Sequence, residues 1–309
     1  GRATETKAMM AFLHEHRFTM SANIHAGTEV VNYPWDDRDS LHADDAWFRF
    51  VSREYADEVH AVDPDYMNLW EDGITNGADW LKIYGGRQDY VTYYLEGREV
   101  TLELSIAKLL GSAYLDEFWQ KNERSLLNYM AQCMYGIRGQ VTDLSTGEAV
   151  MARIEIPGHD STWSVVHSRA SHGDFYRLLA EGVYELVVSA TGYIPETIPN
   201  VEVWTHTATT LDISLVPGET NRNQPDPVVP SVRIYPNPVS ERLYIESRHL
   251  SAGTFDVAVI SMDGRIQLRR SLHHEDGPVP LSTGFLDNGF YVLRIISGEG
   301  TYILRFMKE

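Results

Sequence analysis

The chain has 309 residues, and 26 Lys and Arg against 44 Asp and Glu give it a formal net charge of −18. This length predicts two or three domains, and the negative charge argues against nucleic acid bound through its phosphates. No apolar run approaches the roughly 20 residues that span a bilayer, so we expect no transmembrane segment. The single cysteine, Cys133, excludes an intrachain disulfide and a multi-cysteine metal site.

The first 135 residues alternate between helical and strand patterns. Apolar residues at helical spacing predict helices over 5–16, 44–60 and 113–131. Alternating apolar residues predict strands over 18–24 and 100–104, and the glycines of 73–86 indicate a long loop. This alternation predicts an α/β region. The chain begins without Met and without a basic and apolar leader, so we expect its start to be internal to a longer protein.

From Gly136 onward, short strands separated by polar turns replace this pattern. They fall at 137–142, 151–156, 183–188 and 211–216, and predict a β-sandwich over 136–216. Residues 217–230 carry four prolines and indicate a linker. Four more short strands, at 241–246, 255–260, 290–296 and 301–307, predict a second sandwich over 231–309. The expected fold is therefore an α/β region, residues 1–135, followed by two all-β sandwiches.

Two residues stand where catalytic groups are often found. His25 follows a predicted central strand, at the end where open α/β sheets bind ligands, and imidazole is a common zinc ligand. Glu103 lies on the polar face of 99–105, and a carboxylate beside a metal-bound water can act as a general base. The residues alone favour simpler interpretations, a hydrogen-bonded histidine and a solvated strand face. No Gly-x-Ser-x-Gly motif occurs, so a serine hydrolase has no support.

A longer run of residues points to a family. Residues 18–36 and 73–105 resemble the zinc metallocarboxypeptidases of the carboxypeptidase N/E, or regulatory, subfamily. The resemblance rests on a set of motifs in the order and spacing of that subfamily: Ile74-Thr75-Asn76-Gly77-Ala78, Trp80, Gly85-Gly86-x-Gln88-Asp89 and Thr101-Leu102-Glu103-Leu104-Ser105. Such a combination is far more specific than any one motif.

The resemblance implies a function and assigns residues to it. His25 matches the third ligand of a single Zn²⁺ site, and Glu103 matches the glutamate that activates water. Asp36, eleven residues after His25, matches the acid that holds a C-terminal Arg or Lys, and Gln88 and Gly77 match contributors to the same pocket. The implied activity is removal of basic residues from the C-termini of peptides and proteins. Without the family, Asp36 would be one more charge in an acidic loop.

Two departures from the family pattern matter. Leu81 stands where the family has a tyrosine whose hydroxyl contacts the substrate carboxylate, and Tyr84, three residues on, is the predicted substitute. In the family, the other two zinc ligands form a His-x-x-Glu upstream of the third, and no His-x-x-Glu occurs in this sequence. Catalytic zinc normally has three protein ligands, so we expect this chain alone neither to hold zinc tightly nor to hydrolyse peptides.

The remaining regions also resemble known domains. Residues 136–216 resemble the transthyretin-like sandwich that follows the catalytic domain in this subfamily. Residues 232–309 resemble the C-terminal sorting domain of type IX secretion cargo in Bacteroidetes, on the motifs Ile234-Tyr235-Pro236-Asn237-Pro238, Met262-Asp263-Gly264 and Gly289-Phe290-Tyr291-Val292-Leu293. This resemblance implies the type IX secretion machinery as a partner and a secreted or cell-surface location.

Two other functions stay open on the sequence. Leu81 favours a non-catalytic surface relative that binds peptides, whereas the presence of both His25 and Glu103 argues against it. A purely structural adhesin would explain residues 136–309 but not 1–135.

Overall fold

The computed structural model describes residues 2–161, 163–218, 232–247, 253–261, 265–274, 277–297 and 300–309. The chain forms two compact units, one of Ala8–Asn221 and one of Arg222–Glu309 with Gly1–Lys7, and each is described by itself. Most of the predicted linker, 219–230, and the motif at 262–264 lie outside the described residues. In the described part of the chain, no helix has the length and apolarity needed to cross a bilayer.

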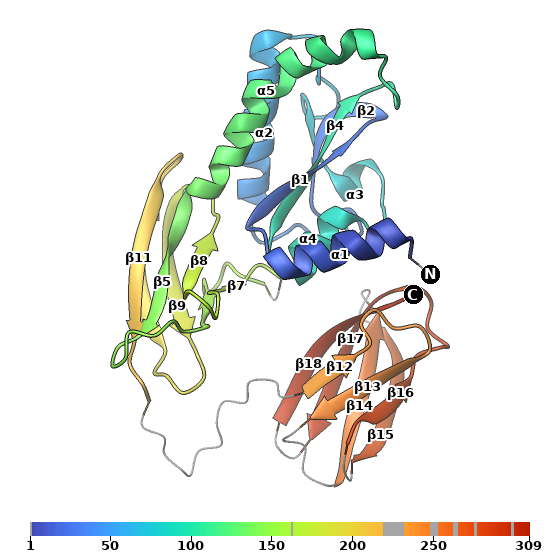
Figure 1. Cartoon of the computed structure of the whole chain (residues 1–309), viewed down its shortest axis with the longest axis vertical. Helices are drawn as coiled ribbons and strands as arrows, with labels where there is room; N and C mark the ends of the chain where they lie inside the picture. The colour runs from blue at the N-terminus through green and yellow to red at the C-terminus, as the bar shows by residue number, and fades with distance from the viewer. Residues whose placement is uncertain are drawn as a thin grey trace. The chain divides into compact units, whose positions relative to one another are not determined.

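The α/β region contains one mixed sheet of four strands, in the order β1-β4-β2-β3 (Figure 1). The strands are β1 (Met20–His25), β2 (Thr28–Tyr33), β3 (Ile74–Asn76) and β4 (Arg98–Ser105). β4 runs parallel to β1 and antiparallel to β2, which is parallel to β3. The prediction that the strand before His25 is central is wrong for the described sheet, because β1 lies at its edge.

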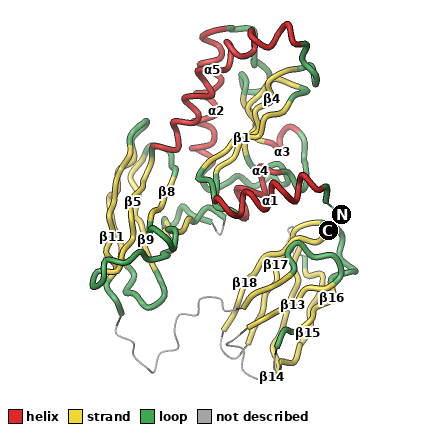
Figure 2. Tube along the Cα trace, in the orientation of Figure 1, coloured by secondary structure: helices red, strands yellow, loops and turns green. Residues whose placement is uncertain are grey.

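Five helices surround this sheet (Figure 2). They are α1 (Thr4–His16), α2 (Asp45–Val62), α3 (Gly77–Trp80), α4 (Arg87–Tyr94) and α5 (Leu115–Ala131), with short 3-10 turns at Ser112–Tyr114 and Gln132–Met134. The three predicted helices are confirmed as α1, α2 and α5. The predicted loop over 73–86 is wrong in part, because it holds β3 and α3. These elements have only three and four residues, too few to establish a period.

The core of this region lies between α2 and the sheet. Phe48, Val51, Tyr55 and Val59 recur at helical spacing on α2 and pack with strand residues such as Leu102 in one buried cluster. The strand β4 is buried along almost its whole length, polar residues included. The interpretation of Glu103 as part of a solvated strand face is therefore wrong.

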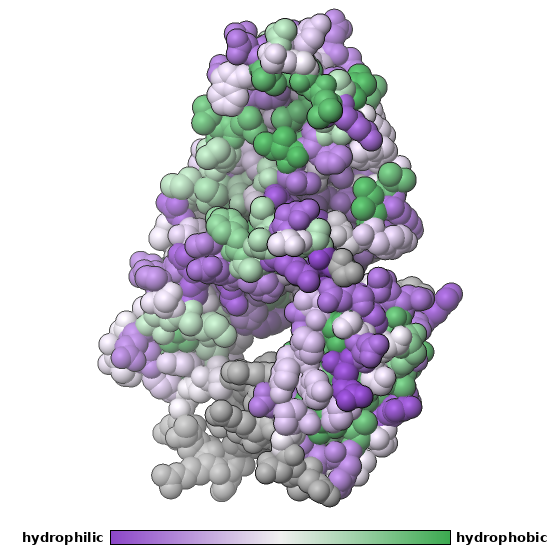
Figure 3. All heavy atoms as spheres, turned by 45° about the vertical axis from the view of Figure 1, so that its right-hand side comes forward, coloured by the Kyte–Doolittle hydropathy of each residue, from purple (hydrophilic) through white to green (hydrophobic). Residues whose placement is uncertain are grey.

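The helix α5 also carries an apolar stripe on its surface. Leu115, Trp119, Leu127, Met130 and, after the helix, Met134 are exposed, and their spacing places them on one side of the helix. Figure 3 shows apolar side chains gathered over the upper part of the molecule in that view, which is the α/β region.

The middle β-region, residues 136–216, consists of two sheets that share one hydrophobic core. One sheet has the order β10-β9-β6-β7, with β6 (Arg153–Glu155), β7 (Val166–His167), β9 (Gly182–Ser189) and β10 (Glu196–Val203). The other has the order β11-β5-β8, with β5 (Gly136–Asp143), β8 (Asp174–Arg177) and β11 (Ala208–Leu215). The four predicted strands are confirmed, while β7, β8 and β10 were missed.

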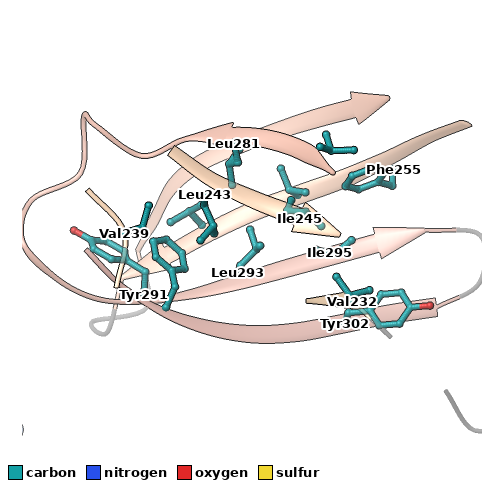
Figure 4. Close-up of a cluster of buried hydrophobic side chains, with 14 of the residues drawn as sticks. Val232, Val239, Leu243, Ile245, Phe255, Leu281, Tyr291, Leu293, Ile295 and Tyr302 are labelled. Carbon is teal, nitrogen blue, oxygen red and sulfur yellow. The ribbon is translucent and has the colours of Figure 1, made fainter. Parts of the chain in front are cut away.

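The C-terminal β-region, residues 232–309, also has two sheets. The first, in the order β12-β13-β16, contains β12 (Val232–Tyr235), β13 (Arg242–Ser247) and β16 (Val279–Ser282). The second, β15-β14-β17-β18, contains β14 (Gly253–Ser261), β15 (Ile266–His274), β17 (Gly289–Ser297) and β18 (Gly300–Lys308). Side chains of both sheets, among them Leu243, Leu281, Leu293 and Ile295, meet in one buried cluster (Figure 4).

Candidate active site

His25 and Glu103, distant in sequence, meet at the carboxyl end of two adjacent strands. They are direct partners in the parallel register of β1 and β4. The His25 Nδ1 lies 2.9 Å from Glu103 Oε1 and 3.0 Å from Oε2. The Glu103 carboxylate is buried, whereas the His25 side chain is 61% exposed. The structure therefore brings together the two residues predicted to take part in catalysis, with the imidazole facing outward.

The described residues do not complete a zinc site around His25. Catalytic zinc takes three protein ligands, and no group of three His, Cys, Asp or Glu donors in the described part of the chain includes His25. Its one close acidic neighbour, Glu103, is the residue predicted to act as a base. His25 thus fits as one ligand of a set that the described residues do not supply.

A second cluster of potential ligands lies where the α/β region meets the middle β-region. Asp44, His159 and Asp160 have donor atoms within 4.8 Å of one another. Two buried guanidinium groups fill the same place. Arg98 Nη2 lies 2.6 Å from Asp44 Oδ2, and Arg177 Nη1 and Nη2 lie 2.7 and 2.8 Å from Asp44 Oδ2 and Oδ1. Arginine cations already neutralise Asp44, so this is an ion-pair cluster and not a metal centre.

Asp36 is buried and fixed from several sides. Its carboxylate Oδ1 accepts hydrogen bonds from Asn32 Nδ2 and Gln88 Nε2, each at 3.0 Å. Its carbonyl oxygen accepts the Ile83 N–H at 3.0 Å, and its own N–H is bound by Asp89 at 3.0 Å. Only 5% of Asp36 is exposed. The interpretation of Asp36 as a solvated loop charge is therefore wrong.

Gly77 leaves the space that the Asp36 carboxylate occupies. A Cβ at position 77 would lie 1.9 Å from Asp36 Oδ1 and 2.9 Å from Asn32 Oδ1, closer than real Cβ atoms approach any heavy atom. A Cβ at Gly86 would lie 3.3 Å from Asp36 Oδ2. The structure thus places Asp36, Gln88 and Gly77 next to one another, and their role as a specificity pocket stays a prediction.

The electrostatics of this site suit a bound cation. Burial, helped by the charges of Asp37 and Glu99 and opposed by the hydrogen bond from Asn32, raises the pKa of Asp36 to about 6. Within the described structure, the buried oxygens Asn32 Oδ1 and Gln88 Oε1 have no hydrogen-bond partner. Buried unpaired acceptors are rare and call for an explanation. Guanidinium and ammonium groups only donate hydrogen bonds, so they complement acceptor oxygens of this kind.

Tyr84 lies on the surface next to this site. Its side chain is 76% exposed, and Leu81 is 58% exposed. The Ile83 N–H bond to the Asp36 carbonyl ties this segment to the pocket. Tyr84 is therefore near the pocket but does not form its buried wall, and its role as the substitute hydroxyl stays a prediction.

Two residues of the site were missed by sequence reasoning. Asn32 lies inside the quoted run 18–36, but nothing in its spacing distinguishes it from its neighbours. Asp89 lies next to Gln88 in a quoted motif, and it accepts the N–H groups of both Asp36 and Asp37. Its position beside a predicted pocket residue was the signal that could have found it.

Comparison with known proteins agrees with this geometry. The family described as zinc carboxypeptidase matches residues 1–125. This part of the chain belongs to the zinc carboxypeptidase family. The family described as a secretion system C-terminal sorting domain matches residues 233–309.

Several curated proteins similar to this chain are named carboxypeptidases. Carboxypeptidase D of Homo sapiens is 35% identical over 236 residues, covering 70% of this chain and 17% of its own length. Carboxypeptidase SOL1 of Arabidopsis thaliana is 35% identical over 230 residues, covering 72% of this chain and 45% of its own length. The human Carboxypeptidase N catalytic chain is 33% identical over 211 residues, covering 63% of this chain and 44% of its own length. The chain thus spans less than half the length of these relatives.

Solved structures add little. A putative carbohydrate binding protein from Bacteroides uniformis covers 55% of this chain and 97% of its own at 12% identity. Its TM-score of 0.22 is too low to carry an argument.

Proposed function

We propose that the chain is part of an exported zinc metallocarboxypeptidase that removes C-terminal Arg or Lys from peptides and proteins. The observation that carries the proposal is the site at Asp36, where a buried carboxylate packed against Gly77 is bound by Asn32 and Gln88, whose side-chain oxygens have no partner within the described structure. A carboxylate with two further acceptor oxygens favours a cationic side chain over an apolar one. The carboxypeptidase names of the relatives support the same reaction class.

Each predicted residue has a role in this proposal. Asp36 pairs with the basic side chain, Gln88 orients the Asp36 carboxylate and offers its free oxygen, and Gly77 provides room. Burial makes the charge match decisive, because an unpaired charge on either side would lose its solvation without compensation. Tyr84 is assigned to the terminal carboxylate of the substrate, where the family uses the position of Leu81. A Tyr84→Phe variant should therefore raise KM, and an unchanged KM would exclude this role.

Glu103 is the residue assigned to proton transfer in the reaction. It takes a proton from the attacking water and delivers a proton to the leaving amine. Its burial beside His25 supports this role, because a buried carboxylate with a hydrogen-bond partner holds a defined position. His25 is assigned as one zinc ligand. A single imidazole is a poor zinc site, so we propose that this chain by itself does not hydrolyse peptides.

The other regions are assigned to support and export. The middle β-region is proposed to be the transthyretin-like sandwich of the subfamily, which packs on the α/β region through the cluster at Asp44. The match over 233–309 supports export by the type IX secretion machinery to the cell surface or the medium.

The test is hydrolysis by a polypeptide that carries these residues together with the complete zinc ligand set. Peptides ending in Arg, Lys, Leu and Phe are compared for wild type, Asp36→Ala and Asp39→Ala. Asp39 is a matched control, because it lies in the same acidic loop and its side chain is 81% exposed. Asp36→Ala should abolish the preference for Arg and Lys, and Asp39→Ala should leave it intact. An undiminished preference in Asp36→Ala would refute the pocket assignment.

A non-catalytic peptide-binding relative is the second candidate, favoured by Leu81 in place of the family tyrosine. It predicts binding of basic C-termini without hydrolysis, even with the full ligand set. Turnover that disappears in Glu103→Gln would exclude it.

A further inference from the structure

Asp89 binds the backbone of Asp36, the residue whose carboxylate is assigned to the pocket. Its Oδ1 and Oδ2 accept the Asp36 N–H at 3.0 and 3.2 Å, and its Oδ2 also accepts the Asp37 N–H at 3.1 Å. Asp89 is 3% exposed. A buried carboxyl group that receives the N–H groups of two successive residues fixes the backbone there, because a buried N–H left without a partner is costly.

The helix α4 supplies this anchor together with a second contact. Gln88 and Asp89 are neighbours in its first turn, and they bind the side chain and the backbone of Asp36 respectively. The helix α4 also packs against the middle β-region, because its Tyr93 stacks on Trp163 with ring centroids 4.1 Å apart. The direction of the Asp36 carboxylate is therefore set by a helix that is itself fixed.

We propose that Asp89 is a positioning residue of the pocket: it fixes the Asp36 and Asp37 backbone so that the Asp36 carboxylate faces an incoming guanidinium or ammonium group. The proposal rests on the proposed function, because it takes Asp36 as the group that pairs with the basic side chain. Asp89 does not touch the substrate in this account.

The charges around Asp89 agree with a role through hydrogen bonding. Burial, together with the charges of Asp36 and Asp37, raises the pKa of Asp89 to about 8, while the bonds from the Asp36 backbone and the charge of Arg38 oppose this rise. Glu99, paired with Arg87, acts on Asp36 from β4. Asp89 is therefore not a second full charge for the ligand at neutral pH. An amide at position 89 that keeps one acceptor oxygen should preserve part of its effect.

The experiment measures binding of two probes to the 309-residue chain at pH 7.5 by ligand-observed NMR. The probes are Nα-benzoyl-arginine and Nα-benzoyl-citrulline, which have nearly the same shape but differ in charge. The quantity reported is the ratio of their Kd values. This ratio is insensitive to a general loss of stability, so it separates positioning from a merely structural role.

The variants are Asp89→Ala, Asp89→Asn and Asp36→Ala, with Asn122→Ala as the matched control. Asn122 is also buried and hydrogen-bonded, to Tyr55 and Tyr66, but belongs to the α2–α5 core. Wild type and Asn122→Ala should favour arginine by about tenfold or more. Asp89→Ala should lower this ratio about fivefold, and Asp89→Asn about two- to threefold, since one acceptor oxygen becomes a donor.

The outcomes distinguish the positioning role of Asp89 from the pocket assignment of Asp36. A ratio near 1 in wild type, or an unchanged ratio in Asp36→Ala, would overturn the pocket assignment and the positioning role with it. A ratio that falls in Asp36→Ala but stays at the wild-type value in Asp89→Ala would overturn the positioning role alone. If Asp89→Ala does not fold, Asp89→Asn decides, and an unchanged ratio there overturns the proposal.

Discussion

The buried cluster at Asp44 allows a sharp prediction about stability. Asp44 has 1% exposure, and its carboxylate receives Arg98 Nε and Nη2 at 2.9 and 2.6 Å. It also receives two bonds from Arg177, and His159 Nε2 lies 2.8 Å from Oδ1. The arginine charges hold the pKa of Asp44 well below its usual range, although burial opposes them. Asp44 is thus ionised at neutral pH.

The change tested is Asp44→Ala. It leaves Arg98 with backbone carbonyls only, from Glu96, Gly97 and Ser164. Arg177 keeps Asp160 and the Leu178 carbonyl. Removing one partner of a buried ion pair typically costs about 3–5 kcal/mol, and because one guanidinium loses its only carboxylate we expect this range for Asp44→Ala.

The assay is urea unfolding followed by tryptophan fluorescence at pH 7. All seven tryptophans of the chain lie between residues 35 and 204, inside the unit Ala8–Asn221, so the signal reports that unit. Asp57→Ala is the control, since its exposed i,i+4 pair with Arg53 should contribute about 0.5 kcal/mol. A loss below about 1 kcal/mol in Asp44→Ala would refute the claim that this cluster joins the two regions.

Three further predictions concern the pocket and the metal. Because the pKa of Asp36 is raised to about 6, the stability that its protonated form contributes in the empty pocket is lost as pH rises through 6. Binding of Nα-benzoyl-arginine should strengthen over the same pH range, because Asp36 becomes charged. Binding that is independent of pH between pH 5 and 8 would contradict this prediction. Gly77→Ala should displace the Asp36 carboxylate and lower the affinity for Nα-benzoyl-arginine about tenfold. Gly111→Ala is the control and should have little effect, because its Cβ would lie 3.6 Å from Tyr114. Equal binding by the two variants would contradict the steric argument. The chain should lose zinc on dialysis against a weak chelator, because His25 is its one assigned ligand; tight one-to-one retention, measured by atomic emission, would show a site that we have not identified.

Long elements could be predicted from the sequence better than short elements and charge networks. The helix α2 and strand β4 carry clear periods, whereas β3 and α3 are too short to have one. The burial of Glu103 was not predictable from alternation, because a strand covered on both faces buries its polar residues as well.

Tertiary contacts explain the remaining differences. On the sequence, Asp44 was only the first residue of the helix predicted over 44–60. In the structure it makes no side-chain cap bond, and its carboxylate binds Arg98 and Arg177, the second 133 residues away. No local pattern encodes such a pairing. Asn32 and Asp89 were missed for the same reason, since their roles depend on where Asp36 folds.

The central claim is that Asp36 binds a positively charged side chain. One comparison of two ligands tests this claim most directly. Wild type and Asp36→Asn, a nearly isosteric change, are titrated with Nα-benzoyl-arginine and Nα-benzoyl-citrulline at pH 7.5. We predict that wild type binds the arginine probe about tenfold more tightly or better, and that Asp36→Asn binds the two probes equally. Equal binding by wild type, or an arginine preference that survives in Asp36→Asn, would contradict the account.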